Sequence, residues 1–339
     1  MKKSLLALAV LGAFAGAASA QTSVTLYGSI DAGVRNVTNI NAVGDSRLTM
    51  GSLGTYSPNR WGVKSVEDLG SGMNAHFVLE GGFNSGTGAL AGDLFSRSAY
   101  VGLGGSWGSL DLGHQYSVNF KTIGAYDPFN YKYTGIIPLA TQGALTRFNN
   151  DIQYTGTFGL VTARAEYALG EQPGSTSDGS AQAFGLSYAG GPFSVGGAYT
   201  QRKNSVGTPA SFEDQKNWTI GGTYAASPFR LAIGYADSKQ EFATVADTDT
   251  KDTWIGGSVN VSPAIGLNLA YYQTKMTTAT SATTTGEGKR KLLIAGATYA
   301  LSKRTNFYAD IDNAKFSGTM IPAGQSRQTG ISAGINHLF

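Results

Sequence analysis

Apolar and polar side chains alternate with a period of two in segment after segment of this chain. In the first segment, one parity holds Val24, Leu26, Ile30, Ala32 and Val34, and the other holds Thr25, Ser29, Asp31 and Arg35. The same alternation returns at residues 75–84, 161–167, 193–202, 217–224 and 229–235. Because successive side chains of a β-strand point to opposite faces, this pattern predicts strands with one apolar and one polar face. The chain is therefore expected to be all-β.

The connections between these segments alternate between short and long. Tight turns are expected at residues 68–72, 104–106, 190–192, 226–228, 262–264 and 302–304. Long polar loops are expected at residues 171–181, 203–216, 237–251, 277–289 and 313–325. Short turns at one end and long loops at the other are typical of transmembrane antiparallel β-barrels with an even number of strands. The spacing predicts about sixteen strands, with roughly twenty residues for each strand and its connection.

Composition is compatible with a barrel without establishing one. The chain has 47 Gly, 17 Tyr and 16 Phe and only 14% charged residues, which fits tight turns and aromatic girdles. After the first twenty residues there is no apolar run of about 18 residues, so no transmembrane helix is predicted. The lack of cysteine excludes a disulfide scaffold and metal sites built on thiolates. The alternative is a soluble all-β protein, whose polar faces meet water and whose apolar faces pack together.

Residues 1–20 have the organisation of a secretory signal peptide. Lys2 and Lys3 form a charged start, an apolar stretch covers residues 5–18, and Ala18-Ser19-Ala20 is a cleavage site of the A-x-A type. The mature chain, residues 21–339, would begin at Gln21; the alternative is an N-terminal membrane anchor. Loss of Lys2 and Lys3 lowers the formal charge from +3 to +1, so no nucleic-acid partner is expected.

The last segment also alternates and ends on an aromatic residue. One parity holds Ile331, Ala333, Ile335, His337 and Phe339. A final amphipathic strand of this kind suits a barrel that closes with its last strand. The alternative is an ordinary edge strand, which would leave unpaired backbone groups and invite aggregation.

The stretch from His114 to Arg147 interrupts the alternation. It carries six aromatic residues, namely Tyr116, Phe120, Tyr126, Phe129, Tyr131 and Tyr133. Asp127-Pro128 and Ile137-Pro138 are incompatible with a helix interior or a central strand. A connection of this length is usually functional or disordered, and disordered segments are poor in aromatics. We therefore expect residues 114–147 to fold into the barrel lumen and narrow it.

Several short motifs, in order along the mature chain, resemble one known family. They are Val24-Thr25-Leu26-Tyr27-Gly28, Asn59-Arg60-Trp61-Gly62, Glu67-Asp68-Leu69-Gly70, Arg97-Ser98-Ala99-Tyr100-Val101-Gly102-Leu103, Arg147-Phe148-Asn149-Asn150-Asp151-Ile152-Gln153-Tyr154, Tyr299-Ala300-Leu301-Ser302-Lys303-Arg304-Thr305 and His337-Leu338-Phe339. The chain resembles the trimeric general porins of the Gram-negative outer membrane, in their betaproteobacterial branch. The resemblance implies sixteen strands, a third loop folded into the pore, and passive diffusion of small ions and hydrophilic solutes. It also implies that Phe339 is read by the barrel-assembly machinery.

The polar parity of a barrel would line water, and it carries seven candidate cations and six candidate acids. The cations are Arg35, Arg60, Lys64, Arg97, Arg147, Arg164 and Arg230, and the acids are Glu80, Asp111, Asp151, Glu166, Asp310 and Asp312. By the resemblance, Arg60, Arg97 and Arg147 match an arginine cluster at the pore constriction. The inserted stretch adds Lys121, Lys132 and a single acid, Asp127, so a modest preference for anions is expected. The alternative is that these arginines only brace the loop.

Two positions depart from the family pattern: His114 stands where Arg is frequent, and Asp151 where a small polar residue is usual. Either could change the charge balance at the constriction.

Enzymatic readings find little support. The three histidines, His76, His114 and His337, form no ligand-spaced pair, and no nucleophile motif accompanies them. No enzyme activity, cofactor or metal is expected. An outer-membrane adhesin that works through its extracellular loops is the remaining alternative to a channel.

The resemblance also implies a homotrimer embedded in outer-membrane lipid. Gly28, Ile30, Ala32 and Val34 would give the first strand a small, close-packing outer surface, and residues 84–95 could latch onto a neighbouring copy.

Overall fold

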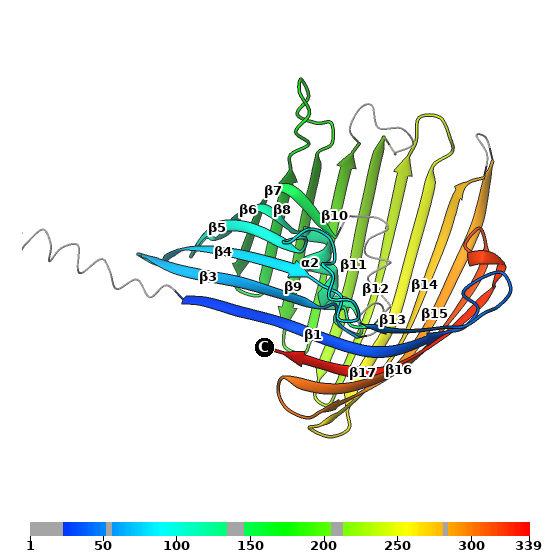
Figure 1. The fold of residues 1–339 in the computed structure, drawn as a ribbon. Helices are drawn as coiled ribbons and strands as arrows, with labels where there is room; N and C mark the ends of the chain where they lie inside the picture. Colours follow the sequence, from blue (N-terminus) through cyan, green and yellow to red (C-terminus); the bar gives the residue numbers. More distant parts are fainter. Residues whose placement is uncertain (1–22, 52–55, 134–145, 205–212, 281–283) are drawn as a thin grey trace, which may run out of the picture.

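The strands of this protein close into an antiparallel barrel around a central space, and the segment after β6 lies inside it (Figure 1). The computed structural model describes residues 23–51, 56–133, 146–204, 213–280 and 284–339. The expected signal peptide, residues 1–20, lies outside the described residues. Among the described residues, no helix is long and apolar enough to cross a membrane.

Seventeen strand segments form one continuous sheet within the described residues. They are β1 (Ser23–Val37), β2 (Arg47–Gly51), β3 (Arg60–Gly70), β4 (Met73–Gly82), β5 (Ser98–Gly105), β6 (Gly108–Tyr116), β7 (Arg147–Phe158), β8 (Val161–Ala168), β9 (Ala181–Gly190), β10 (Phe193–Lys203), β11 (Asp214–Ala226), β12 (Phe229–Glu241), β13 (Thr248–Asn260), β14 (Ile265–Ala279), β15 (Thr285–Ala300), β16 (Thr305–Gly318) and β17 (Arg327–Leu338). Two 3₁₀ turns, η1 (Gly124–Tyr126) and η2 (Pro322–Gly324), and one helix, α2 (Val118–Ile123), complete the described elements.

The seventeen segments fill sixteen positions in the wall. β1 pairs with β2 through residues 33–37 and with β3 through residues 23–29. β2 and β3 therefore occupy the same position, one above the other. On its other side β1 pairs with β17, from Ser29 opposite Leu338 to Val37 opposite Gly330, which closes the barrel. The prediction of an all-β barrel of about sixteen strands is confirmed.

The two faces of the wall have the distribution expected of a membrane barrel. On β1, the outward side chain of Leu26 is 61% exposed, whereas the inward carboxylate of Asp31 is fully buried. Outward apolar side chains are similarly exposed on the other strands, for example Leu186, Leu231, Ile255 and Leu269. A soluble sheet would bury such side chains against a second layer; here they form the surface that meets lipid.

Three predicted loops are shorter than expected. β12 continues to Glu241 and β13 starts at Thr248, so much of the region 237–251 is strand. Likewise β14 runs to Ala279, β15 starts at Thr285 and β16 runs to Gly318. Backbone pairing between neighbouring strands does not require an apolar face, so the strands extend past the point where the apolar alternation ends.

Phe339 extends the pairing of the last strand with the first. The Gly28 N–H donates to the carbonyl of Phe339 (3.0 Å), and the Phe339 N–H donates to the Gly28 carbonyl (3.2 Å). The aromatic ring lies against Gly28: a Cβ at that position would be 2.3 Å from the Cζ of Phe339. Glycine is therefore the residue that allows this ring to cover the first strand.

The inserted segment is shorter than the predicted 114–147. His114, Gln115 and Tyr116 belong to β6, which pairs with β5 and β7, and Arg147 begins β7. The loop proper thus runs from Ser117 to Thr146, of which residues 134–145 lie outside the described part. Ser117 caps α2 through its hydroxyl, which accepts from the Phe120 N–H. The chain then turns through η1 and crosses toward β12–β15.

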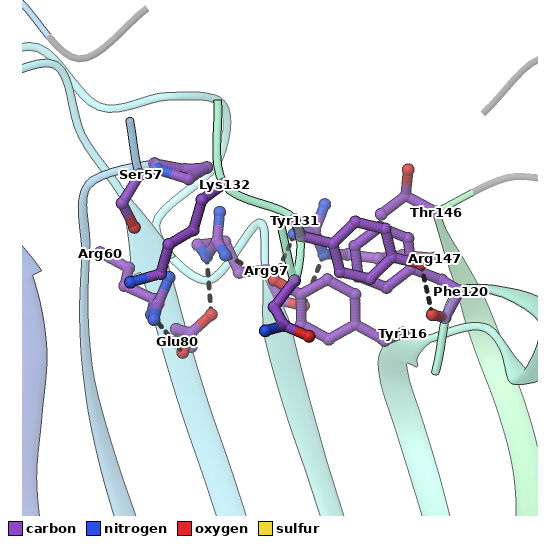
Figure 2. Close-up of a pocket in the computed structure, with 12 residues that line it drawn as sticks. Ser57, Arg60, Glu80, Arg97, Tyr116, Phe120, Tyr131, Lys132, Thr146 and Arg147 are labelled. Atoms are coloured by element: carbon purple, nitrogen blue, oxygen red, sulfur yellow. Dashed lines mark hydrogen bonds and ion pairs between the residues drawn. The ribbon is translucent and has the colours of Figure 1, made fainter. Parts of the chain in front are cut away.

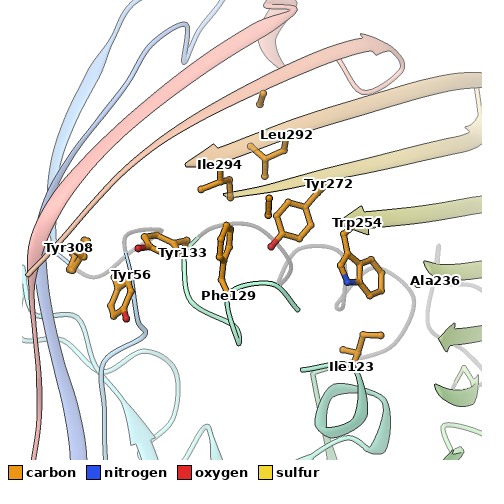
Figure 3. Packing of buried hydrophobic residues seen from close by; sticks show 12 residues of the cluster. Tyr56, Ile123, Phe129, Tyr133, Ala236, Trp254, Tyr272, Leu292, Ile294 and Tyr308 are labelled. Carbon is orange, nitrogen blue, oxygen red and sulfur yellow. The ribbon is translucent and has the colours of Figure 1, made fainter. Parts of the chain in front are cut away.

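An apolar cluster fills the space between this loop and the wall of β12–β16 (Figure 3). It contains Phe129 and Tyr133 from the loop and the inward-facing Tyr272, Leu292 and Ile294 from the wall. Leu292 and Ile294 break the polar-inside rule because the loop covers them. On β15 the run from Leu292 to Ile294 is apolar on both faces, which is a sequence signal for cover on both sides.

Candidate functional site

A cavity of about 500 Å³ lies between the loop and the inner wall of β3–β7 (Figure 2). Its lining consists of Ser57, Pro58, Arg60, Glu80, Arg97, Tyr116, Phe120, Asn130, Tyr131, Lys132, Thr146 and Arg147. Four of these side chains are cationic and one is a carboxylate. The structure thus brings together four of the six predicted constriction residues: Arg60, Arg97, Lys132 and Arg147.

Tyr116 connects two of the arginines. Arg97 donates from Nη2 to the Tyr116 hydroxyl (2.6 Å), and Arg147 donates from its own Nη2 to the same oxygen (2.7 Å). The Arg147 guanidinium also lies over the Tyr116 ring, 4.2 Å from its centroid. A phenol oxygen has two acceptor lone pairs, so it can hold both cations at once.

Glu80 is the single carboxylate among the described residues that line the cavity, and it is shared by several partners. It accepts from Arg97 Nε at Oε1 (2.6 Å) and from the Tyr27 hydroxyl at Oε2 (3.0 Å). Arg60 Nε is farther away, 3.8 Å from Oε2. The Arg60 side chain is also more exposed than that of Arg97, 31% against 15%. Glu80 therefore offsets mainly the charge of Arg97.

The loop contributes its own cation to the cavity. Lys132 donates from Nζ to the Tyr56 hydroxyl (2.8 Å), and the same nitrogen lies 4.4 Å from the centroid of the Tyr56 ring. Tyr56 is in turn stacked on Tyr308 with a centroid distance of 4.8 Å. Both contacts are with the uncharged Tyr56, so neither offsets the charge that Lys132 brings to the loop side of the cavity.

Lys121 does not line the cavity. On α2 it projects toward β6 and β7, where Nζ donates to the side-chain oxygens of Gln115 (3.1 Å) and Gln153. Burial lowers the pKa of Lys121, against the opposing effect of nearby acids such as Asp111 and Glu166. Phe120, its neighbour on the helix, faces the cavity instead.

Asp127 is likewise absent from the lining. It is fully buried and accepts from the Tyr272 hydroxyl (2.8 Å) and from the Tyr131 N–H (2.7 Å). Burial raises the pKa of Asp127 to about 6 despite these hydrogen bonds. Asp127 fastens the loop to the far wall and does not border the opening.

The two residues that depart from the family pattern also lie outside the lining. His114 contacts the Asn149 side chain through Nδ1 (2.5 Å) and the Ser96 carbonyl through Nε2 (3.1 Å). Asp151 is buried and accepts from Gln153.

Two other predicted lumen cations act as braces. Arg35 pairs with Asp312 at 2.7 Å, and Arg230 binds loop carbonyls. The bracing alternative concerns Arg60, Arg97 and Arg147, of which Arg97 pairs with Glu80 at 2.6 Å.

Sequence reasoning did not single out Tyr116 or Glu80 as constriction residues. Glu80 was detectable from its inward parity. Tyr116 was not detectable, because the chain has 17 tyrosines and nothing in the sequence distinguishes the one at the end of this strand.

A closed barrel with an apolar outer surface and an internal loop beside a charged opening is the architecture of a membrane-spanning channel. Residues 7–319 match the sequence model of the family described as Gram-negative porin. The chain therefore belongs to the Gram-negative porin family of the outer membrane, and the predictions of a porin and of a protein that is not an enzyme are confirmed.

Two relatives come from betaproteobacteria, in agreement with the predicted branch. Outer membrane porin protein 32 of Delftia acidovorans is 40% identical over 229 residues, which cover 63% of this chain and 64% of the relative. An outer membrane porin protein of Bordetella pertussis is 48% identical over 144 residues, 38% of this chain and 37% of the relative. The matched parts thus span less than two thirds of either relative's length.

Solved structures agree over nearly the whole chain. An anion-selective porin from Comamonas acidovorans aligns with a TM-score of 0.80 and 29% identity, covering 94% of this chain and all of the other. The trimer form of OmpT from Vibrio cholerae aligns with a TM-score of 0.70, covering 94% of this chain and 99% of the other, but at 15% identity it supports the fold alone.

Proposed function

We propose that this porin is a passive diffusion channel for small hydrophilic solutes and ions, and that it passes anions more readily than cations. The observation that carries the proposal is the charge of the cavity, where Arg60, Arg97, Arg147 and Lys132 face one carboxylate, Glu80. The structural relative at 29% identity is described as anion-selective, which supports the same preference.

The physical basis is the local concentration of counter-ions. A unit charge about 5 Å from a passing ion interacts with it by about 0.8 kcal/mol in water, roughly a fourfold effect on concentration. Salt at about 0.1 M screens charges beyond about 10 Å, so only the side chains that border the passage act at full strength. The preference is therefore modest, and it weakens as ionic strength rises.

The direct test is the reversal potential of the purified protein in a planar bilayer under a KCl gradient. We expect the sign that marks chloride as the more permeant ion, with a larger magnitude at low salt. A protein that inserts as a folded barrel but does not conduct would overturn the channel and favour the adhesin. A reversal potential of the opposite sign would overturn the anion preference alone.

We further propose that the protein is a homotrimer. The outer surface where β1, β2, β16 and β17 meet has a shallow apolar groove of about 460 Å³, with Ala32, Gly33, Ala333 and Gly334 among its lining. Small residues allow another barrel to approach closely. The predicted latch, residues 84–95, presents Leu90 and Leu94, which are both about half exposed.

Phe339 is proposed to serve as the signal that the barrel-assembly machinery reads. Its ring remains 38% exposed at the rim although its backbone is paired with Gly28.

A further inference from the structure

The loop is fastened to the wall on the side opposite the cationic cavity. Two side chains bind four successive carbonyls of the segment 125–128. Arg230 donates to Ala125 (2.7 Å), Asp127 (2.8 Å) and Pro128 (3.0 Å), and Trp254 donates from Nε1 to Tyr126 (2.8 Å). This density of contacts makes the segment 125–128 the anchor of the loop.

Behind the anchor the wall carries glycines, and the loop or Trp254, which binds it, occupies the space that their side chains would need. A Cβ on Gly221 of β11 would lie 2.5 Å from the Cβ of Tyr126, and its three nearest atoms all belong to Tyr126. A Cβ on Gly234 of β12 would lie 2.0 Å from Cζ2 of Trp254, the residue that binds the Tyr126 carbonyl. Real Cβ contacts this short are essentially never seen, so any larger residue would displace these rings.

Two more glycines make the same kind of contact at the two ends of the described loop. A Cβ on Gly185 of β9 would meet Thr122 Oγ1 at 2.7 Å and Val118 Cγ1 at 2.8 Å, both from α2. A Cβ on Gly296 of β15 would meet Cζ and the hydroxyl oxygen of Tyr133 at 2.8 Å. At Gly185, Gly221 and Gly296 the nearest atoms are side chains of the loop, and at Gly234 they belong to the wall residue Trp254 that binds the anchor. We name Gly185, Gly221, Gly234 and Gly296 the socket glycines.

We propose that the socket glycines are positioning residues that set how far the loop stands from its supporting wall, and thereby the width and the ion preference of the opening on the opposite side. The loop residues Asn130, Tyr131 and Lys132, which line the cavity, follow the anchor within a few positions. Close-packed side chains transmit a displacement instead of absorbing it. Moving Tyr126 from 2.5 Å to ordinary contact with a new Cβ shifts the anchor by about 1 Å toward the arginines. The inference rests on the proposed channel function.

The sharpest experiment compares Gly221→Ala with Gly222→Ala. The two glycines are neighbours on β11, but Gly222 faces outward beside Ile233, and the nearest atom to a Cβ there is the Ser194 carbonyl oxygen at 3.4 Å. We expect Gly221→Ala to lower single-channel conductance by roughly a third and to raise the anion-to-cation ratio, because Lys132 approaches the arginines. Gly222→Ala should match the wild type in both. Wild-type conductance and ion preference in a folded Gly221→Ala, or equal changes in both variants, would overturn the proposal.

A second experiment does not depend on the folding of Gly221→Ala. At Gly296 the contact is with the tip of the Tyr133 ring, so Tyr133→Ala removes the contact itself. We expect Gly296→Ala to alter conductance in the wild-type background and to add nothing in Tyr133→Ala. Additive effects of the two substitutions would contradict the socket role.

Hydrogen exchange of residues 117–133 separates this inference from the proposed function. We expect Gly221→Ala, but not Gly222→Ala, to accelerate amide exchange across the anchor, whether or not current flows. If the wild type does not conduct but the two variants show this exchange pattern, the channel function is refuted and the role of the socket glycines stands. If the wild type conducts but the variants lack the pattern, the role of the socket glycines is refuted and the channel function stands.

Discussion

Arg60 and Arg147 are the arginines of the cavity whose charge is least offset by nearby groups. Arg147 donates to the Arg97 carbonyl and to the Tyr116 hydroxyl, which are both uncharged, and Arg60 reaches Glu80 only at 3.8 Å. Arg97, in contrast, donates to Glu80 at 2.6 Å. The family resemblance assigns these three arginines the same role, but the electrostatic field that each exerts on a passing ion is different.

This inequality predicts a ranking of single substitutions. Arg60→Gln and Arg147→Gln should each lower the anion-to-cation ratio about twofold at low salt, and Arg97→Gln should lower it less. Glu80→Gln should raise the ratio, because it removes the one negative charge. The anion-to-cation ratio of each of the four variants is obtained from its reversal potential. Lys251→Gln, which lies outside the cavity, is the control for charge removal. If the three arginine variants keep the wild-type ratio, the arginines are braces and not a filter.

At the scale of the loop, the buried carboxyl of Asp127 predicts a dependence of anchoring on pH. Its pKa is about 6 in the docked loop, above the ordinary value of 3.8. The docked state therefore binds the proton more tightly, and docking is strengthened as pH falls through the window between these two values. Integrated over that window, the effect is at most about 3 kcal/mol.

Hydrogen exchange of residues 117–133, corrected for its intrinsic pH dependence, should show more protection near about pH 5 than near about pH 7.5. Asp127→Asn keeps an oxygen for the Tyr272 hydroxyl and cannot titrate, so it should abolish the difference. An unchanged pH dependence in Asp127→Asn would assign the effect to another group.

At the scale of the whole molecule, the groove between β1 and β17 predicts that barrels associate. An unheated sample in mild detergent should migrate, and scatter light, as a trimer. Replacing Ala333, which lines the groove, with a bulky residue should yield monomers that remain folded. A wild type that is monomeric by both measurements would exclude the trimer.

Removal of Phe339 should impair assembly more than it destabilises the finished barrel. A fully buried aromatic side chain contributes about 1.5–3 kcal/mol, and this ring is partly exposed, so its share is smaller. We expect lower yield in the outer membrane, while protein refolded in detergent keeps a barrel of nearly wild-type stability. Phe184→Ala, which loses an outward aromatic of β9 away from the groove, is the matched control. Normal yield of the shortened chain would rule out the signal role.

The sequence by itself determined the barrel, the outward and inward faces, the approximate strand number and the existence of an inserted loop. These features follow from a local rule: a strand turns successive side chains to opposite faces, so alternation can be read without knowing what lies across the barrel. The inward direction of Arg60 follows from the same rule. That of Arg97 does not, because Arg97 precedes β5 on the parity opposite to the buried Ser98. A register shift between β6 and β7 likewise separates Arg147 from the inward Asp151, yet the three arginines do meet in one cavity.

Only the tertiary structure decided which charges border the opening. Lys121 and Asp127 are as polar in sequence as Lys132, yet they turn toward the wall, because the path of the loop depends on residues far along the chain. Arg230 binds the Asp127 carbonyl across 103 positions, and Tyr272 binds its carboxylate across 145. Whether a loop residue lines the passage or anchors the loop depends on such distant contacts, and no local pattern records them.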